Sequence, residues 1–194
     1  MKERIRHLEG LQEANLPADE YEIIHSAWLA LMGLRPNGDL DIIISSKLRR
    51  ERFSEYDANV TFGIPGALER RIRVHPANSP YGQIFGMKDI DDVIYHHFLE
   101  IDGLHFVEPR FYFEIKRQRL EQLVQKQKSL PWWKRWLLRG YSEKKLSRKI
   151  RKDRDDLVLV DRFFAEGKHK TSKFNNISEE AWGTNTFKKC PVSS

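Results

Sequence analysis

The sequence predicts an α/β (α+β) fold, in which a small mixed β-sheet flanked by helices is followed by a basic helical C-terminal portion. Residues 21–44 show two short apolar strand patterns around an apolar helical stretch. Leu99 to Val107 has the pattern of a hairpin centred on Asp102-Gly103, a turn pair that accepts positive φ. Pro109 favours the start of a helix, and residues 144–164 have the pattern of a second, continuous helix.

The second strand pattern carries two acids, Asp39 and Asp41. Side chains alternate along a strand, so both carboxylates are expected on one face while Leu40 and Ile42 take the other. Hard anionic oxygens two residues apart are ligands that Mg²⁺ or Mn²⁺ accepts, with water and phosphates completing the shell. Solvated alternation on an edge strand produces the same pattern without any metal.

The surrounding residues favour the metal interpretation. Ser26 stands at the turn from the first strand into the helix, and Gly33 closes that helix. A helix N-terminus with a hydroxyl beside it presents unpaired N–H groups that suit a phosphate. Together with Asp39 and Asp41, these residues predict a metal-nucleotide site.

The same residues resemble the nucleotidyltransferase (polymerase-beta-like) superfamily in its small, minimal bacterial form. That signature is an apolar strand ending in Gly-Ser or Gly-Gly, a helix, and then Asp-x-Asp or Asp-x-Glu. The resemblance covers roughly residues 20 to 165, and these segments carry it: Ile23-Ile-His-Ser26, Gly33-Leu-Arg35, Asp39-Leu-Asp41, the segment 101–109 leading to Lys116, and Lys152-Asp153-Arg-Asp-Asp156.

The resemblance implies Mg²⁺-dependent transfer of a nucleoside monophosphate from a nucleoside triphosphate, such as ATP, to an acceptor hydroxyl. Asp39 and Asp41 would hold the metal and carry the catalysis. The nucleotide-binding residues implied are Ser26, Gly33, Arg35, Lys116 and Lys152. Lys116 has a second interpretation as a surface lysine whose stem lies on apolar neighbours. The Lys-Asp-x-x-Asp element is expected first to brace the helical half against the sheet.

Two positions depart from the superfamily pattern. His25 replaces the usual glycine before the serine, and Arg73 stands where an acid is expected on the next strand, predicted over 69–75. Either another acid serves, or the chemistry is altered or lost. The alternative hypothesis is therefore a catalytically degenerate protein of this fold that binds nucleic acid or a protein partner.

Further helices are predicted on both sides of these segments. One spans Glu3 to Ala14, with Ile5, Leu8 and Leu11 inward. The others cover residues 47–53, capped by Ser45-Ser46, and residues 87–98.

A chain of 194 residues is long enough to bury a sizeable core. We expect a nucleotidyltransferase-like core over 1–115, a basic helical portion over 116–165, and a tail over 166–194 that serves as a loosely ordered strap. The single cysteine, Cys190, excludes an internal disulfide and a multi-cysteine zinc site.

The positive charge is concentrated in one segment. Residues 115–154 hold 15 Lys/Arg and 3 Asp/Glu, a net +12 against +6 for the whole chain. Such a segment suits a polyanion or an anionic membrane surface, although solvated helices are also commonly lysine-rich.

Within this segment, residues 130–140 interleave Trp132, Trp133 and Trp136 with basic residues, as interfacial helices do. This arm could lie on a membrane, hold a polyanionic acceptor, dock a second subunit, or pack its tryptophans on the domain. A membrane-surface enzyme acting on a glycan or lipid precursor is thus a third hypothesis. The N-terminus lacks the apolar stretch of a signal peptide, so a cytoplasmic location, in solution or at the membrane surface, is expected.

Overall fold

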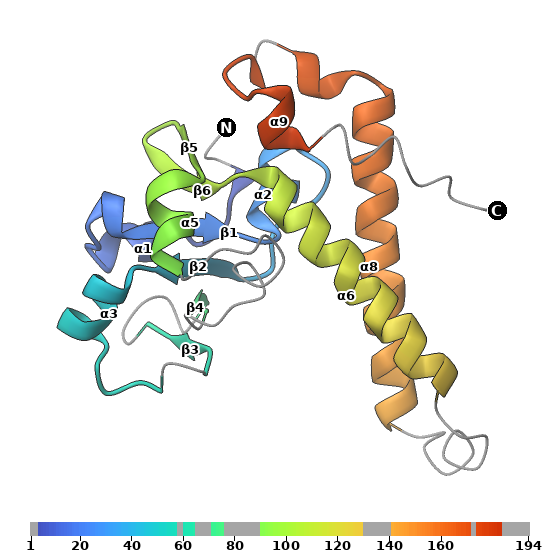
Figure 1. Cartoon of the computed structure of the whole chain (residues 1–194), viewed down its shortest axis with the longest axis horizontal. Coiled ribbons are helices and arrows are strands. Elements are labelled where there is room, and N and C mark those ends of the chain that lie inside the picture. The colour runs from blue at the N-terminus through green and yellow to red at the C-terminus, as the bar shows by residue number, and fades with distance from the viewer. Residues whose placement is uncertain are drawn as a thin grey trace. The chain divides into compact units, whose positions relative to one another are not determined.

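The computed structural model describes residues 4–57, 60–64, 71–75, 90–129, 141–171 and 174–183. The chain divides into two compact units (Figure 1). The sheet unit comprises Met1–Tyr112 and Ile177–Ser194, and the helical unit comprises Phe113–Asn176. The expected core ended at residue 115, and the expected tail, 166–194, is divided between the two units.

Six strands among the described residues form one mixed sheet in the order β3-β4-β2-β1-β6-β5. The strands are β1 Tyr21–Ile24, β2 Leu40–Ile44, β3 Phe62–Gly63, β4 Ile72–Val74, β5 Phe98–Ile101 and β6 Leu104–Val107. β1 runs antiparallel to β2 and parallel to β6, and β2 runs parallel to β4. The α/β fold class predicted from the sequence is confirmed.

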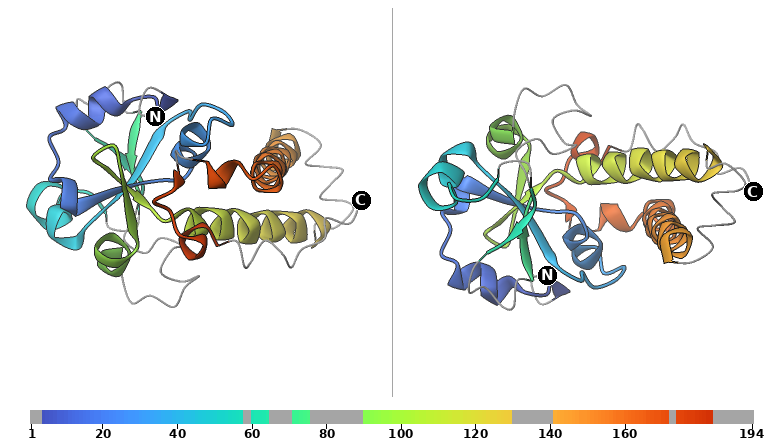
Figure 2. Two further views of the ribbon diagram at one scale, coloured as in Figure 1. Left: turned by 90° about the horizontal axis from the view of Figure 1, so that it is seen from above. Right: turned by 90° about the horizontal axis from the view of Figure 1, so that it is seen from below.

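Helices cover both faces of this sheet. α1 (Leu8–Glu13) and α2 (Ala27–Leu31) lie on one side and α5 (Ile90–His96) on the other (Figure 2). Trp28 of α2 is fully buried, packs against Phe106 of β6, and donates its indole N–H to the carbonyl of Val107 at 2.7 Å. This anchoring holds the turn between β1 and α2 at the edge of the core.

Several local predictions are confirmed. Ser45 caps α3 (Ser46–Arg52) by accepting a hydrogen bond from the Leu48 N–H at 3.0 Å. β5 and β6 form the predicted hairpin, with Asp102 and Gly103 at φ 54° and 71°. α6 (Pro109–Ser129) begins at its proline and α8 (Tyr141–Ala165) contains the predicted continuous helix.

The N-terminal helix is shorter than predicted. α1 begins at Leu8 because His7 adopts φ 72°, a left-handed conformation that a continuing helix cannot contain. Ile5 and Leu11 are buried as expected, while Leu8 is half-buried. Asn37 is fully buried, and its side chain makes two hydrogen bonds to the Arg6 backbone. Its Oδ1 accepts from the Arg6 N–H, and its Nδ2 donates to the Arg6 carbonyl.

A C-terminal segment belongs to the core of the sheet unit. α9 (Glu179–Trp182) is capped by Ser178, and Trp182 lies against Trp28 with ring centroids 5.7 Å apart. Trp182 is 1% exposed, so this part of the expected tail contributes a large buried side chain.

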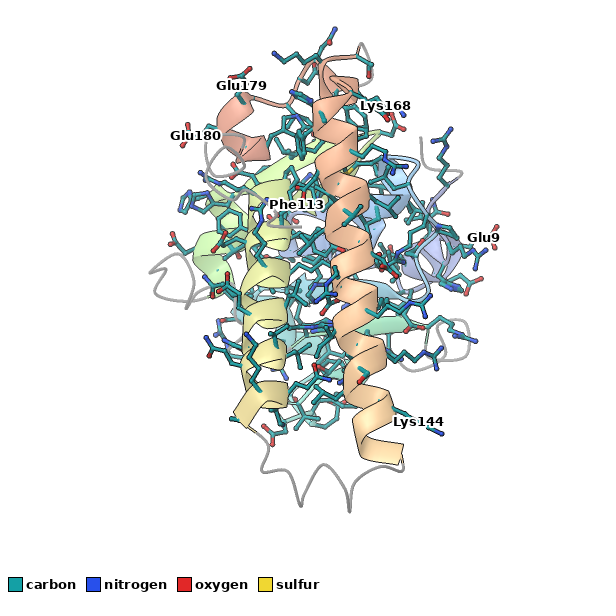
Figure 3. All side chains as sticks on the ribbon, turned by 90° about the vertical axis from the view of Figure 1, so that its right-hand side faces the viewer. Glu9, Phe113, Lys144, Lys168, Glu179 and Glu180 are labelled. Atoms are coloured by element: carbon teal, nitrogen blue, oxygen red, sulfur yellow. The ribbon has the colours of Figure 1, made fainter. Side chains whose placement is uncertain are left out.

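The helical unit is a hairpin of two helices followed by the short 3₁₀ helix η4 (Lys168–Lys170). Phe113 lies between α6 and α8, edge-on to Phe164 (Figure 3). The inward positions of α8 repeat every three or four residues through Leu146, Ile150, Asp153, Leu157 and Val160.

Two acids occupy inward positions of α8 and are neutralised by α6. Asp153 and Asp156 are 0% and 2% exposed. The Lys116 ammonium lies 2.5 Å from Asp156 and 3.4 Å from Asp153, and Arg119 lies 2.8 Å from Asp153. This buried ion cluster joins the two helices of the hairpin.

No helix in the described part of the chain has the length and apolar character needed to cross a bilayer. The tryptophan-rich arm at 130–140 lies outside the described residues.

Lys116→Met should destabilise the protein strongly because it removes the buried ammonium that Asp153 and Asp156 share and leaves Arg119 on Asp153 alone. Breaking a buried ion pair on one side costs about 3–5 kcal/mol. Urea unfolding of Lys116→Met beside Lys152→Met measures this cost, since Lys152 is exposed on the same unit and its loss should stay within about 0.5 kcal/mol. Equal stabilities of the two variants would contradict the buried cluster.

Candidate functional site

The two predicted acids lie at the start of β2. Asp39 immediately precedes the strand and Asp41 is its second residue, paired with Arg73 of β4. Directly paired residues of neighbouring strands point to the same face. Arg73 also contacts Asp39, so both carboxylates lie on the face that Arg73 shares, as the alternation predicted.

Asp39 is bound by two arginines of the segment that forms β4. Its Oδ2 lies 3.0 Å from Arg73 and its Oδ1 lies 3.4 Å from Arg71. The arginine side chains are about half exposed, at 52% and 56%, and the Asp39 side chain is 24% exposed. Ion pairs this accessible to water contribute about 0–1 kcal/mol each. They are therefore exchangeable contacts that a ligand can replace.

Asp41 is bound by a histidine from the same segment. His75 Nε2 lies 2.9 Å from Asp41 Oδ1, and the His75 ring meets His25 edge-on at 4.7 Å between centroids. Burial raises the pKa of Asp41, but the His75 hydrogen bond and the charges of His25, His75 and Arg73 outweigh it, so this pKa lies below its ordinary value. Asp41 is thus held as a carboxylate.

His25 stands at the turn between β1 and α2 with φ 58°. This left-handed conformation is the one that glycine adopts without steric cost. Glycine would adopt this conformation more readily than the histidine that is present. Here an imidazole projects from the turn and meets His75 and, at 6.2 Å between ring centroids, Tyr112.

The remaining predicted nucleotide-binding residues of the sheet unit are Ser26, Gly33 and Arg35, which lie at the two ends of α2 and just after it. Ser26 precedes α2, and its hydroxyl makes no capping hydrogen bond to that helix. Because α2 has five residues, any phosphate contact would come from the hydroxyl and not from a helix dipole. Gly33, at φ 76°, closes α2, and the Arg35 guanidinium donates to the Pro36 carbonyl at 3.1 Å.

The two predicted lysines belong to the helical unit. Lys116 is 8% exposed and is held in the buried cluster with Asp153 and Asp156, so it is not a surface lysine. Lys152 lies on the exposed side of α8. These contacts give Lys116 a structural role within its own unit.

Glu22 is a buried acid of β1. It is 0% exposed, and among the residues that the structure describes neither of its carboxylate oxygens has a hydrogen-bond partner. Burial, and then the nearby charge of Glu108, raises the pKa of Glu22 well above its ordinary value. A carboxyl held in the neutral form is a poor metal ligand.

In the described ranges, no group of three His, Cys, Asp or Glu side chains could hold a metal ion. Asp39 and Asp41 are therefore a two-carboxylate set, and Arg73 occupies the place where the sequence pattern led us to expect a third acid.

Sequence reasoning did not assign roles to two residues of this region. His75 binds Asp41, and Asn37 fixes the chain before β2 by donating to the Asp39 carbonyl at 3.1 Å. Arg71, Arg73 and His75 alternate along the segment that forms β4, and this alternation could have predicted a cationic face on that strand.

Glu22→Gln should stabilise the protein at neutral pH. The raised pKa means that the folded state keeps the proton, whereas the unfolded chain loses it near the ordinary value of 4.5. The contribution of Glu22 to the free energy of unfolding of the wild type is therefore fully present below that pH, and it declines as the pH rises toward the folded-state pKa. The amide does not ionise, so the two proteins should diverge upward from about pH 4.5 in urea unfolding.

Glu9→Gln is the matched control, since Glu9 is exposed on α1 of the same unit. A constant stability difference between Glu22→Gln and wild type at every pH would show that Glu22 is ionised in the folded protein.

Comparison with family models, with curated proteins and with solved structures found no match to this chain.

Proposed function

We propose that the protein is a magnesium-dependent nucleotidyltransferase that moves a nucleoside monophosphate from a nucleoside triphosphate to an acceptor hydroxyl. The observation that carries this proposal is the pair Asp39 and Asp41 on one face of β2, with the strand, helix and strand order that the sequence resemblance implies. β4 lies parallel beside β2, where the next strand of that pattern is expected.

The donor set fits Mg²⁺. This ion commonly takes one or two protein carboxylates, with water and substrate phosphates as its remaining ligands. Asp41 uses Oδ1 for His75, and its Oδ2 is the atom that would face the ion. Asp39 would exchange its exposed arginine contacts for the metal. Bound there, Mg²⁺ would neutralise phosphate charge and favour ionisation of the attacking hydroxyl.

The same exchange gives Arg71 and Arg73 a function. A metal–triphosphate complex carries net negative charge, so guanidinium groups released from Asp39 gain phosphate oxygens as bidentate partners. Ser26, with a hydroxyl that does not cap α2, would donate to a phosphate. His75 keeps Asp41 oriented and ionised through its hydrogen bond.

Asp39→Asn and Asp41→Asn should each lower transfer by about a hundredfold or more, since Lewis-acid stabilisation contributes several kcal/mol to such reactions. Purified protein is incubated with each labelled nucleoside triphosphate and Mg²⁺, and protein-bound or acceptor-bound label is counted. Asp19→Asn, an exposed acid of η2 (Ala18–Glu20), is the control and should retain full transfer. Full transfer by Asp39→Asn would refute the assignment.

A second candidate function is binding without catalysis, in which a degenerate protein of this fold holds nucleic acid or a protein partner. Arg73 favours it because a guanidinium occupies the expected third-acid position and neutralises Asp39. The transfer assay on the wild-type protein, followed by Arg73→Asp, distinguishes the two candidates. A degenerate protein should lack transfer and gain Mg²⁺ affinity on this substitution, as measured by calorimetry, whereas an active enzyme should transfer label before any substitution.

A further inference from the structure

The first half of α8 carries an unusual density of positive charge. Residues 144–152 read Lys-Lys-Leu-Ser-Arg-Lys-Ile-Arg-Lys and contain no acid. The six basic side chains of this basic face are all exposed: Lys144, Lys145, Arg148, Lys149, Arg151 and Lys152. At a rise of 1.5 Å per residue they occupy about 12 Å of helix.

This arrangement opposes helix stability. Like charges three or four residues apart repel each other on a helix surface, and Arg148 has such neighbours at Lys144, Lys145, Arg151 and Lys152. Lys144 also lies in the first turn, where the helix dipole favours acids. A run of six basic residues without an acid departs from the mixed charge signs that stabilise a helix surface through ion pairs.

Two described acids of α8 lie next to this face, Asp153 and Asp155. Asp153 is buried and engaged with Lys116 and Arg119. Asp155 lies 3.8 Å from Arg151, but both side chains are strongly exposed, at 64% and 85%, so the pair is weak. The second half of α8 is different because its basic residues stand among Asp155, Asp156 and Asp161.

The end of α6 extends the basic face. Gln127 Nε2 lies 3.3 Å from Ser147 Oγ, which brings the last turns of α6 beside the first turns of α8. Lys126 and Lys128 are exposed in those turns. Figure 3 shows Lys144 projecting outward at this end of the hairpin.

We propose that the basic face of α8 binds the phosphodiester backbone of nucleic acid. Closely spaced phosphates relieve the repulsion among these cations and release counterions, and backbone contacts need no apolar surface. A membrane surface fits less well because an interfacial helix buries an apolar side in lipid. Here the apolar residues between 144 and 152 are Leu146, which is half-buried, and Ile150, which is buried.

The test is fluorescence anisotropy of labelled single-stranded RNA and of labelled duplex DNA over a series of salt concentrations. The triple variant Arg148→Gln, Arg151→Gln, Lys152→Gln should weaken binding at least about tenfold and reduce the slope of log K against log salt by about two to three. The control variant Arg162→Gln, Lys168→Gln, Lys170→Gln removes equal charge from exposed positions of the same unit and should bind within about twofold of wild type.

Two outcomes would overturn the proposal. Equal weakening by both triple variants would mean that net charge alone governs binding, and tight binding to phosphatidylserine vesicles without nucleic-acid binding would assign the face to membranes. Thermal unfolding excludes a folding defect, because the Arg148 triple variant loses repulsion and should melt no lower than wild type. The inference is independent of the proposed catalysis, so Asp39→Asn with Asp41→Asn should leave nucleic-acid affinity unchanged.

Discussion

The register between β2 and β4 decides what the sheet unit can do. Parallel pairing sets Asp41 opposite Arg73, and the two-residue period then places Asp39, Arg71 and His75 on the same face. A slip of one residue would turn these charged groups into the core and Ile72 outward. The buried residues on the opposite face, including Ile42 and Val74, exclude that slip. Hydrophobic burial thereby fixes the electrostatics of the candidate site.

That face carries charges of both signs before any ligand binds. Two carboxylates face two guanidiniums and an imidazole, and the arginine contacts are accessible to water. Such a set offers ligands both to a divalent cation and to an anionic phosphate. The ion pairs of the helical unit differ in this respect. Lys116 and Asp156 are buried and cannot exchange partners without a large loss of stability.

Much of the fold could be predicted because local chemistry and tertiary structure agree. Asp102-Gly103 forms the predicted turn, Pro109 is the first residue of α6, and Ser45 caps α3. The predicted N-terminal helix was too long because nothing in the sequence marks His7 as left-handed. The burial of Trp182 against Trp28 also depends on packing between distant segments, which periodicity does not report.

The candidate site was predictable only in part. Alternation alone placed Asp39 and Asp41 on one face, but the partners of those acids depend on which strand lies beside β2 and in which register. His75 therefore had no assigned role until Asp41 was seen within 2.9 Å of it. Lys116 illustrates the converse, since its identity suggested phosphate contacts while its burial with two aspartates makes it part of the hairpin.

The two charged regions of the molecule should therefore respond to salt in opposite ways. In the sheet unit, cations and anions attract one another, so screening weakens contacts that are already made. On the basic face of α8, exposed cations repel one another, and screening removes a cost of folding while it competes with any polyanion. Charges of both signs thus suit a site that exchanges ligands, whereas exposed charge of one sign suits a surface that binds a charged polymer.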